Sequence, residues 1–452
     1  LVDIDLLQQQ RVLRAAAYTS QRSDYGALVM HGFPKEGQTL DEVRDLLLGE
    51  VAKLRNGEFT DELLKAVVNN EKADVMRLME SNESRVELYL SSFYNDIPWA
   101  DMVHSLDRLG SITKEQLIDW ANEKLGAENY GVIYKRQGTD PNEMKISKPQ
   151  ITPILMNRDT KSDFLTEIQN STVAPIEPVF VDFERDMKIF RTDSGLEVLY
   201  KKNETNDLFS LTYLFETGTI NDPALNSAFS YLDYLGTKAK SAAEIASELY
   251  DIACHYQLTA GQNRCYVTFK GLGENMGQVM EIFEDLVANA QSDEEILAAY
   301  KADLLKKRAD AKLSQSSNFA ALQKYAFFGP EAIRRTTLSN PRLEALTSEE
   351  LLDKVRDLMT KQHTILYYGP ASEKELLAAL KEHHCTPETM EPISTAHNTF
   401  LPTPENKVYL ADYDAKQLYF LQYANLGRGF DAATDPLLTL YNEYTSGSMG
   451  SI

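Results

Sequence analysis

The amino-acid sequence predicts an α+β fold made of repeated units, each with a mostly antiparallel sheet and helices packed on one face. The first observation is an internal repeat, because two long stretches about 233 residues apart share the same order of strands, helices and helix caps. The second is the order of elements in the later stretch, which reads strand, strand, helix, helix, strand, helices, strand. A parallel doubly wound sheet would alternate strands and helices strictly.

The first copy opens with a predicted strand at residues 25–31 and a predicted helix at 40–54. Thr60 and Thr113 each precede polar or acidic residues and then an apolar run, which indicates a helix N-cap. The hydroxyl of such a residue accepts hydrogen bonds from the unpaired amides of the first turn, and nearby carboxylates complement the helix dipole. A closing strand is predicted at 130–134.

The second copy matches the first element by element. It has a predicted strand at 265–269 and a predicted helix at 276–289. Ser292 and Thr347 are its expected helix caps, and a strand is predicted at 364–368.

A third and incomplete copy begins near Asn406. Its segments mirror three segments that open the second copy, so we expect two strands and then a helix that begins at the Asp-Pro pair. The matching pairs are 407–411 with 196–200, 417–421 with 208–212, and 435–438 with 222–225.

Two breaks divide the chain. Between residues 137 and 181 the periodicity fades and prolines accumulate, which is typical of an extended interdomain connector, and a second proline-rich break runs from 386 to 406. The predicted organisation is a first unit at 1–145, a linker at 146–181, a second unit at 182–385, a connector at 386–405, and the start of a third unit at 406–452.

The composition excludes several classes of function. Lys and Arg number 46 against 68 Asp and Glu, and the net charge of −22 repels the phosphates of nucleic acids and anionic lipids. The three cysteines form neither a C-x-x-C pair nor an even-numbered framework, so a disulfide scaffold or a zinc ribbon is not indicated. No apolar run approaches the roughly 18 residues that would span a bilayer. Because the chain begins at Leu1, we expect a leader or a domain to precede it, and the sequence specifies no compartment.

Three local motifs have a structural and a functional interpretation. Gly271 to Gly277 follows a strand and opens a helix, but its spacing is not the dinucleotide fingerprint and the sequence favours a plain turn. His383, His384 and Cys385 are metal-ligand types, yet adjacent helical side chains point about 100° apart, which favours a histidine pair that complements the helix dipole. Residues 445–451 resemble a nucleophile elbow without its first glycine, so a turn is favoured there.

The duplication and four short segments, 12–18, 32–40, 175–182 and 222–225, resemble the insulinase/pitrilysin (inverzincin) family of zinc metallopeptidases. The likeness covers nearly the whole chain and implies LuxS/metallohydrolase-like domains. Members of the family resemble a clamshell of two halves, each a pair of homologous domains, that encloses unfolded peptides. On this scheme the chain holds the second domain, the linker, the third domain and the start of the fourth.

The family's first domain carries an H-x-x-E-H helix, and the resemblance places a degenerate copy of that motif in the third domain. Ser230 and Tyr234 stand at the positions of the two histidines, and Asp233 stands at the glutamate. The family's later glutamate ligand falls near Lys306 and Lys307. A hydroxyl and a phenol do not replace two neutral imidazoles as zinc ligands, and cations repel a metal. We therefore expect no catalytic or metal-binding residue in this chain, and Zn²⁺ only in an upstream domain.

The resemblance implies that the chain is a non-catalytic portion of a zinc metallopeptidase that hydrolyses short unfolded polypeptides, and that it forms part of the substrate chamber. The alternative is an inactive scaffold or peptide-binding subunit that partners a separate active peptidase. The implied partners are peptides or unfolded polypeptides, together with an upstream catalytic domain or a homologous active subunit. Unpaired strand edges also favour self-association.

Overall fold

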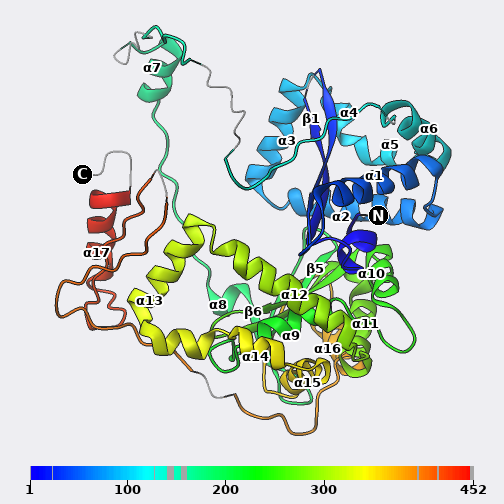
Figure 1. Ribbon diagram of the computed structural model, residues 1–452. Helices are drawn as coiled ribbons and strands as arrows, with labels where there is room; N and C mark the ends of the chain where they lie inside the picture. The colour runs from blue at the N-terminus through cyan, green and yellow to red at the C-terminus, as the bar shows by residue number, and fades with distance from the viewer. Residues whose placement is uncertain are drawn as a thin grey trace.

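The computed structural model describes residues 2–22, 24–126, 128–139, 147–153, 160–393, 396–414 and 417–447. A first unit, built from residues up to 126, packs against a larger middle unit that contains the main sheet (Figure 1). The C-terminal segment lies along a long helix of the middle unit, on the side of the molecule away from the first unit (Figure 1).

The first unit is a two-stranded sheet with helices, and it closely follows the predicted caps. Thr60 and Thr113 are N-caps as expected, and each accepts a hydrogen bond from a backbone amide in the first turn. The elements are η1 (Val2–Gln8), β1 (Arg14–Gln21), β2 (Gly26–Phe33), α1 (Leu40–Asn56), α2 (Asp61–Leu78), α3 (Asn82–Tyr94), α4 (Trp99–Val103), α5 (Ser105–Gly110) and α6 (Lys114–Lys124).

The strand predicted at 130–134 is absent from the structure, and this expectation was wrong. The Tyr134 hydroxyl donates to Asp41 Oδ1 at 2.7 Å and accepts from the Arg44 guanidinium at 2.9 Å. These bonds hold the segment at the start of α1, where no described strand pairs with it. A strand forms only when its backbone groups find a partner strand.

The middle unit contains most of the regular structure. Its elements, after the linker helix α7 (Asp163–Asn170), are α8 (Phe183–Asp186), β3 (Lys188–Arg191), β4 (Glu197–Lys202), β5 (Leu208–Phe215), α9 (Leu225–Leu232), α10 (Ala242–Asp251), β6 (Cys254–Ala260), β7 (Cys265–Leu272), η2 (Gly273–Asn275), α11 (Met276–Asn289), α12 (Glu294–Ala311), α13 (Gln315–Thr336), α14 (Asn340–Ala345), α15 (Ser348–Met359), β8 (Thr364–Gly369) and α16 (Glu373–His383). Thr347 caps α15 as expected, whereas Asp293 caps α12 in place of the predicted Ser292.

The main sheet has six strands in the order β3-β4-β8-β5-β7-β6. All of its pairs are antiparallel except β4 with β8, so the predicted α+β class with a mostly antiparallel sheet is confirmed. Alternate residues of β5 point into the core, where Leu211, Tyr213 and Phe215 are fully buried. Residues Ser210 and Thr212, on the other face, remain half-buried.

The core lies between this sheet and the helices that cover one of its faces. Helix α11 contributes Val279, Met280 and Phe283, all fully buried, and it contacts both β6 and β7. The Phe283 ring lies 5.3 Å from that of Phe269 in an edge-to-face arrangement. Aromatic packing of this kind adds to the free energy gained by burying the apolar area.

The two units touch through α2 and α10. The Asn70 side chain donates to the backbone oxygen of Tyr250 at 2.7 Å, and the Asn206 side chain donates to Glu80 Oε1 at 2.9 Å. Both bonds are on the exposed side of the contact.

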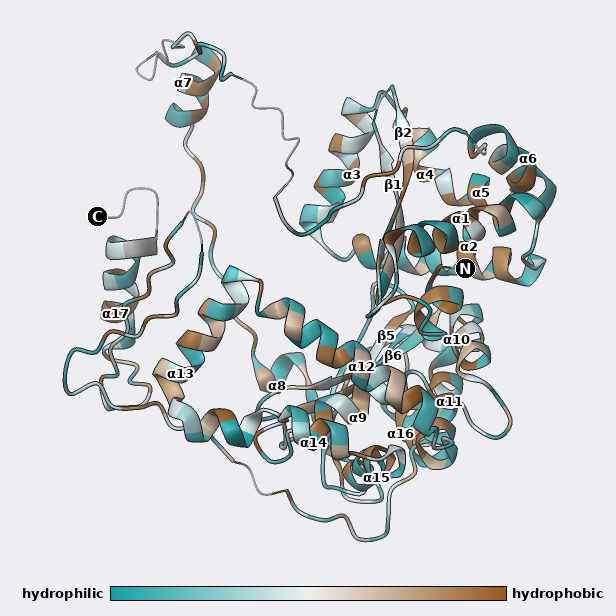
Figure 2. Cartoon of the chain, in the orientation of Figure 1, coloured by the Kyte–Doolittle hydropathy of each residue, from teal (hydrophilic) through white to brown (hydrophobic). Residues whose placement is uncertain are grey.

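The predicted linker contains one helix, α7, which Ser162 caps. Residues 171–181 form neither helix nor strand, and apolar side chains there are open to solvent, with Ile176 93% and Val179 90% exposed. Brown residues along this part of the trace mark the same feature (Figure 2). In the part of the chain that the structure describes, no helix is both long and apolar enough to cross a bilayer.

In the C-terminal segment, the expected helix is present and the two expected strands are not. The helix α17 (Asp435–Asn442) begins at the Asp-Pro pair, and η3 (Glu443–Gly447) follows it. The described parts of 407–411 and 417–421 form no strand, so that expectation was wrong. The segment packs on α13 through side chains, among them Tyr409 against Tyr325 and Tyr423 against Phe327, and these contacts do not pair the backbone.

Candidate functional site

Helix α9 carries the residues that stand at the degenerate motif. Asp222 Oδ1 accepts from the backbone amide of Ala224 at 2.8 Å and so fixes the turn that starts the helix. The same carboxylate pairs with Lys354 of α15 at 2.6 Å. Most of the helix is buried, including Phe229 and Tyr231, so its position is set by the core of the middle unit.

The three motif residues straddle the end of this helix. Ser230 lies within α9 and is half-buried, and Asp233 is the C-cap residue. Tyr234 follows in a turn, in which its amide donates to the backbone oxygen of Tyr231 at 3.1 Å. Because the helix ends before Tyr234, Ser230 and Tyr234 do not form the one-turn helical pair that a two-histidine site uses.

Helix α12 faces α9, and its residue Tyr300 fills the space between them. The Tyr300 hydroxyl is hydrogen-bonded to Ser227 and Ser230, while burial raises the pKa of this phenol. Its ring centroid lies 6.0 Å from that of Tyr231 and 6.1 Å from that of Tyr234. Ser230 is therefore tied to the opposite helix by a phenol.

Asp303, one turn further along α12, brings a buried carboxylate close to this group. Burial raises the pKa of Asp303, and the nearby cations of Lys35 and Lys307 oppose that shift. Lys35 Nζ lies 3.9 Å from Asp303 Oδ1 and donates to the Gln10 backbone oxygen at 2.9 Å. The first unit thus supplies a positive charge to the edge of the site.

Lys306 and Lys307, the residues expected near the third ligand position, are both half-buried on α12. Lys306 Nζ pairs with Asp310 at 3.2 Å. The sequence reasoning missed Tyr300 and Asp303. The spacing of Leu297, Tyr300 and Asp303 in the sequence could have identified them, since buried residues at every third position mark the inward face of a helix.

Asp233 is an exposed residue, but its carboxyl group lies largely among protein atoms and is hydrogen-bonded to Tyr256. Surrounding protein raises the pKa of Asp233 to about 6 by desolvation, and a hydrogen bond with Tyr256 partly opposes the shift. Burial also raises the pKa of the Tyr234 phenol, and the negative charge of Asp303 adds to the effect. At neutral pH the site thus offers hydroxyl groups and, at Asp233, a mostly ionised carboxylate.

These groups do not fit a catalytic zinc ion. Zinc in peptidases takes neutral imidazole nitrogens and a carboxylate, whereas Ser230 and Tyr234 present hydroxyls. Among the residues that the structure describes, no three His, Cys, Asp or Glu side chains are grouped so that they could hold a metal. The arrangement can donate and accept hydrogen bonds.

A second polar group is buried beneath the sheet, and it contains His384. This residue follows the last residue of α16 and leaves the helical conformation. His384 Nε2 contacts His363 Nε2 at 2.9 Å, and His384 Nδ1 contacts Glu284 Oε1 at 2.7 Å. Its ring stacks on that of Tyr213 at 4.1 Å. His384 is thus a buried hydrogen-bonding residue, which the dipole interpretation of the pair did not foresee.

The three side chains of this His-His-Glu cluster are linked by a chain of hydrogen bonds. His363 Nδ1 lies 2.9 Å from the Lys361 backbone oxygen, so it donates, and His363 Nε2 accepts from His384 Nε2. The remaining contact joins His384 Nδ1 to the Glu284 carboxylate.

The glycines from 271 to 277 serve close packing. A Cβ on Gly271, whose φ is 152°, would lie 2.3 Å from Cys254 Sγ, and a Cβ on Gly277 would lie 2.8 Å from His383 Nε2. Residues 448–451 of the motif that resembles a nucleophile elbow lie outside the described residues.

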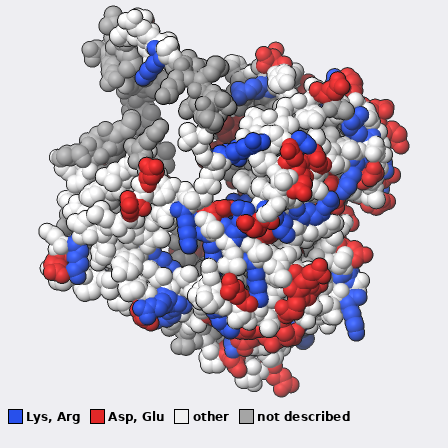
Figure 3. Space-filling view, viewed as in Figure 1, with Lys and Arg blue, Asp and Glu red and all other residues white. Residues whose placement is uncertain are grey.

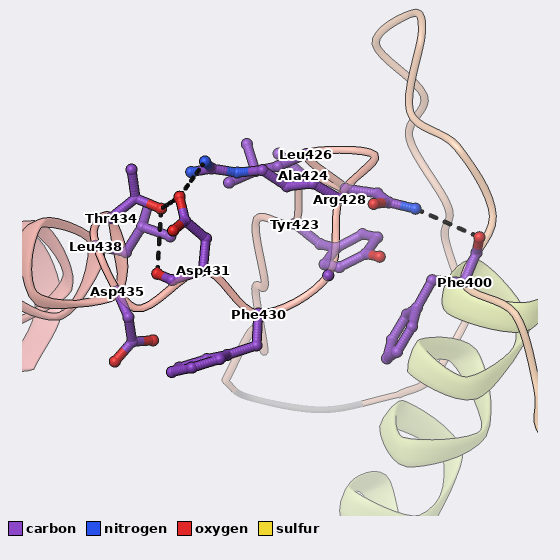
Figure 4. A pocket seen from close by; sticks show the side chains of 12 residues that line it. Phe400, Tyr423, Ala424, Leu426, Arg428, Phe430, Asp431, Thr434, Asp435 and Leu438 are labelled. Carbon is purple, nitrogen blue, oxygen red and sulfur yellow. Dashed lines mark hydrogen bonds and ion pairs between the residues drawn. The ribbon is translucent and has the colours of Figure 1, made fainter.

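One pocket, of about 260 Å³, is formed by the C-terminal segment (Figure 4). Phe400, Tyr423, Phe430 and Leu438 give it an apolar lining. Its lining cation, Arg428, pairs with Asp431 at 3.3 Å. Acidic and basic side chains are interspersed on the face drawn in Figure 3, so no groove of a single sign crosses that face.

No protein-family model matches this sequence, and no curated protein matches it. Solved structures do. An inactive domain of peptidase M16 from Pseudomonas fluorescens is 16% identical, with a TM-score of 0.41 over 47% of this chain and 54% of that chain. The periplasmic protease PqqL from Escherichia coli is 12% identical, with a TM-score of 0.42 over 88% of this chain and 47% of that chain.

A mutant of the ferredoxin protease FusC, in complex with Arabidopsis ferredoxin, is 13% identical, with a TM-score of 0.41 over 86% of this chain and 46% of that chain. The chain spans about half the length of the solved structures it matches. These structures belong to the insulinase/pitrilysin family that the sequence resembles.

Proposed function

We propose that this chain is the non-catalytic portion of a zinc metallopeptidase and forms part of the wall of a chamber that encloses short unfolded polypeptides. One observation carries the proposal: the motif positions hold Ser230, Asp233 and Tyr234 in place of two histidines and a glutamate. Their hydroxyls and single carboxylate suit contact with a peptide better than activation of water on zinc.

The local packing supports a role in binding without chemistry. The hydroxyl of Ser230 is engaged by Tyr300, and Asp303 is flanked by two cations, so neither group is free to act as a metal ligand. Asp233 keeps contact with solvent and carries the one carboxylate at the motif that an incoming peptide amide can reach. Zinc and the general base are then supplied by residues outside this chain.

The proposal is tested first by metal content and hydrolysis. The chain, purified with excess zinc, is expected to hold far less than one zinc per molecule and to leave a labelled unfolded peptide uncut. A ratio near one that is lost in a Ser230→Ala and Asp233→Ala variant would overturn the proposal.

The binding role is tested by fluorescence anisotropy of the same peptide. We expect saturable binding that weakens several-fold in Tyr300→Phe, because this change frees Ser227 and Ser230 and loosens α9 against α12. The matched control is Tyr94→Phe on the exposed surface of α3, which should bind like the unmodified chain. Equal binding by both variants would exclude the α9–α12 site as the contact.

The alternative is that the whole protein is an inactive scaffold or peptide-binding subunit. The longer polypeptide decides between the two, by peptide hydrolysis in the presence of zinc. Hydrolysis that is lost when an upstream H-x-x-E-H glutamate is replaced supports the peptidase, and peptide binding without hydrolysis supports the alternative.

A further inference from the structure

Lys35 reaches from the first unit to the edge of the α9–α12 site. It opens a tight turn, in which the Gln38 amide donates to the Lys35 backbone oxygen at 3.2 Å and Gly37 adopts a φ of 75°. A positive φ inside a turn favours glycine, which has no Cβ to clash. The Gln38 side chain braces the turn, since it accepts from the Lys35 amide at 3.0 Å and donates to the Arg11 backbone oxygen at 3.1 Å. The backbone of Lys35 is thus fixed to the first unit.

The head group of Lys35 is fixed as well. Its ammonium donates to the Gln10 backbone oxygen at 2.9 Å. Gln10 has a φ of 51°, which residues other than glycine, asparagine and aspartate seldom adopt. A backbone conformation of this kind costs free energy and persists where the surrounding structure requires it. Here it presents a carbonyl to the ammonium, so both ends of the Lys35 side chain are held.

The ammonium faces a buried carboxylate of the middle unit. Lys35 Nζ lies 3.9 Å from Asp303 Oδ1, and the side chains of Lys35 and Asp303 are 25% and 11% exposed. This separation is too long for a hydrogen bond, but partly buried charges attract each other across it because salt and water screen them less than exposed ones. Lys35 thus attracts the Asp303 carboxylate without taking up its capacity to accept hydrogen bonds.

Asp303 lies beside the motif residues. It shares the inward face of α12 with Tyr300, whose hydroxyl is hydrogen-bonded to Ser230. Burial raises the pKa of the Tyr234 phenol, and the negative charge of Asp303 raises it further, so this carboxylate lies within electrostatic range of the motif. Asp303 is therefore placed to accept a hydrogen bond from a polypeptide bound at the motif.

Two cations act on Asp303, and they come from different units. Burial raises the pKa of this carboxyl, whereas Lys35 and Lys307 lower it. Lys307 lies on α12, about one turn after Asp303, so its contribution belongs to the middle unit alone. Lys35 belongs to the first unit, so its contribution depends on the packing of the two units. A carboxyl that is buried without a nearby cation favours its neutral form, which accepts hydrogen bonds less well than a carboxylate.

We propose that Lys35 of the first unit is a positioning residue for the peptide site of the middle unit, where its ammonium holds the Asp303 carboxylate in place as an acceptor for the backbone amides of a bound polypeptide. This role rests on the proposed function, because it assigns a further residue to the same α9–α12 site. Through Asp303, the first unit takes part in binding that the motif residues of the middle unit begin.

The first test measures the binding of a labelled unfolded peptide by fluorescence anisotropy at pH 7. Lys35→Met keeps a long side chain and removes the charge, and it should weaken binding several-fold. Asp303→Asn should weaken binding at least as much, and the double variant should bind no more weakly than Asp303→Asn, since Lys35 acts through Asp303. The control is Lys124→Met on α6, which also removes one paired cation from the first unit and should bind like the unmodified chain.

The outcomes separate this role from the proposed function. Peptide binding that Lys35→Met leaves unchanged, or a double variant in which the two single losses multiply, overturns the role of Lys35 alone. An unmodified chain that binds no peptide overturns the proposed function, and the role of Lys35 falls with it.

The second test is the pH profile of the same binding, which a merely structural role of Lys35 would not shift. Binding should weaken as the pH falls and Asp303 takes up a proton. In Lys35→Met this weakening should begin at a higher pH, because the ammonium that lowers the pKa of Asp303 is gone. Asp233 titrates in both proteins, so its effect cancels from the difference, and Lys124→Met should keep the unmodified profile. Weaker binding at every pH with an unchanged profile overturns the proposal.

Discussion

The first and middle units contain the same succession of caps and helices, yet among the described residues only the middle unit has a wide sheet. Its β7 lies between two strands, whereas β2 of the first unit has one neighbour among the described strands. As a result Val267 in β7 is 1% exposed, while Leu28 at the matching position of β2 is 38% exposed. The comparison teaches that in this repeat helices are specified locally, whereas strands depend on a partner from elsewhere.

The largest expected effect is loss of a core aromatic in the middle unit. Phe283→Ala should lower the free energy of unfolding by about 3–5 kcal/mol, because it leaves a cavity between α11 and the sheet. Leu28→Ala in β2 should cost far less, since its side chain is already partly in water. Urea unfolding followed by circular dichroism measures both, and similar losses would contradict the contrast between the units.

The next effect concerns the buried His-His-Glu cluster of the middle unit, which has no counterpart in the described part of the first unit. His384→Ala should cost about 3 kcal/mol, because it leaves Glu284 and His363 without their partner in the interior. His383→Ala, at the neighbouring position, is the matched control and should cost much less because its side chain is 22% exposed. Equal losses in the urea midpoint would show that the cluster does not stabilise the fold.

The same cluster should make the middle unit sensitive to acid. Burial lowers the pKa of His363 to about 4 from its usual 6.5, and the electrostatic interaction with the neighbouring His384 ring lowers it further. The stability that neutral His363 contributes is present above pH 6.5 and is lost as pH falls through about 4. His363→Gln, which keeps a donor and an acceptor, should flatten this part of the pH profile of the urea midpoint.

A smaller loss of stability is expected when the N-cap residue of equivalent helices in the two units is replaced. Thr113→Ala and Thr347→Ala each remove a side-chain bond to a first-turn amide and should cost about 1 kcal/mol in the helix they cap. Native-state hydrogen exchange would locate each loss. If each change weakens the protection of backbone amides from exchange in both units, the two units unfold together. The two units would then differ in how their side chains pack, and not in whether they unfold independently.

The smallest effect is at Asp233. Because desolvation raises its pKa to about 6 from 3.8, the stabilising state is the protonated one, fully present below pH 3.8 and lost as pH rises through 6. Asp233→Asn should therefore raise the urea midpoint slightly at pH 7 relative to the unmodified chain and leave it unchanged at acid pH. A gain of the same size at both pH values would assign the effect to something other than charge.

The helices of this fold follow from the sequence with little error. The predicted helix at 276–289 coincides with α11, and the caps at Thr60, Thr113 and Thr347 are confirmed. The N-cap of α12 lies one residue later than predicted, because the Asp293 side chain accepts the hydrogen bonds from first-turn amides that were expected at Ser292. Helices close their hydrogen bonds within their own residues, so local sequence determines them.

The strands that were predicted but are absent from the structure have one physical cause in common. Residues 130–134 and 417–421 have the apolar pattern of strands, but the structure gives them side-chain partners in place of backbone partners. The same limit applies to the candidate site. The resemblance located Ser230 and Tyr234, whereas Tyr300, Asp303 and Lys35 reach them from an opposing helix and from another unit, which no local pattern encodes.

The exposed segment at 171–181 also controls how a protease would divide the molecule. Solvent-exposed apolar residues such as Ile176 and Val179 lie on backbone without helix or strand, and proteases cut such backbone first. While the chain is whole, the linker keeps the two units at an effective concentration on the order of millimolar. After a cut there, the contacts between the two units, among them those of α2 with α10 and of Lys35 with Asp303, would have to hold the first unit without the linker, and a weak contact would release it on dilution.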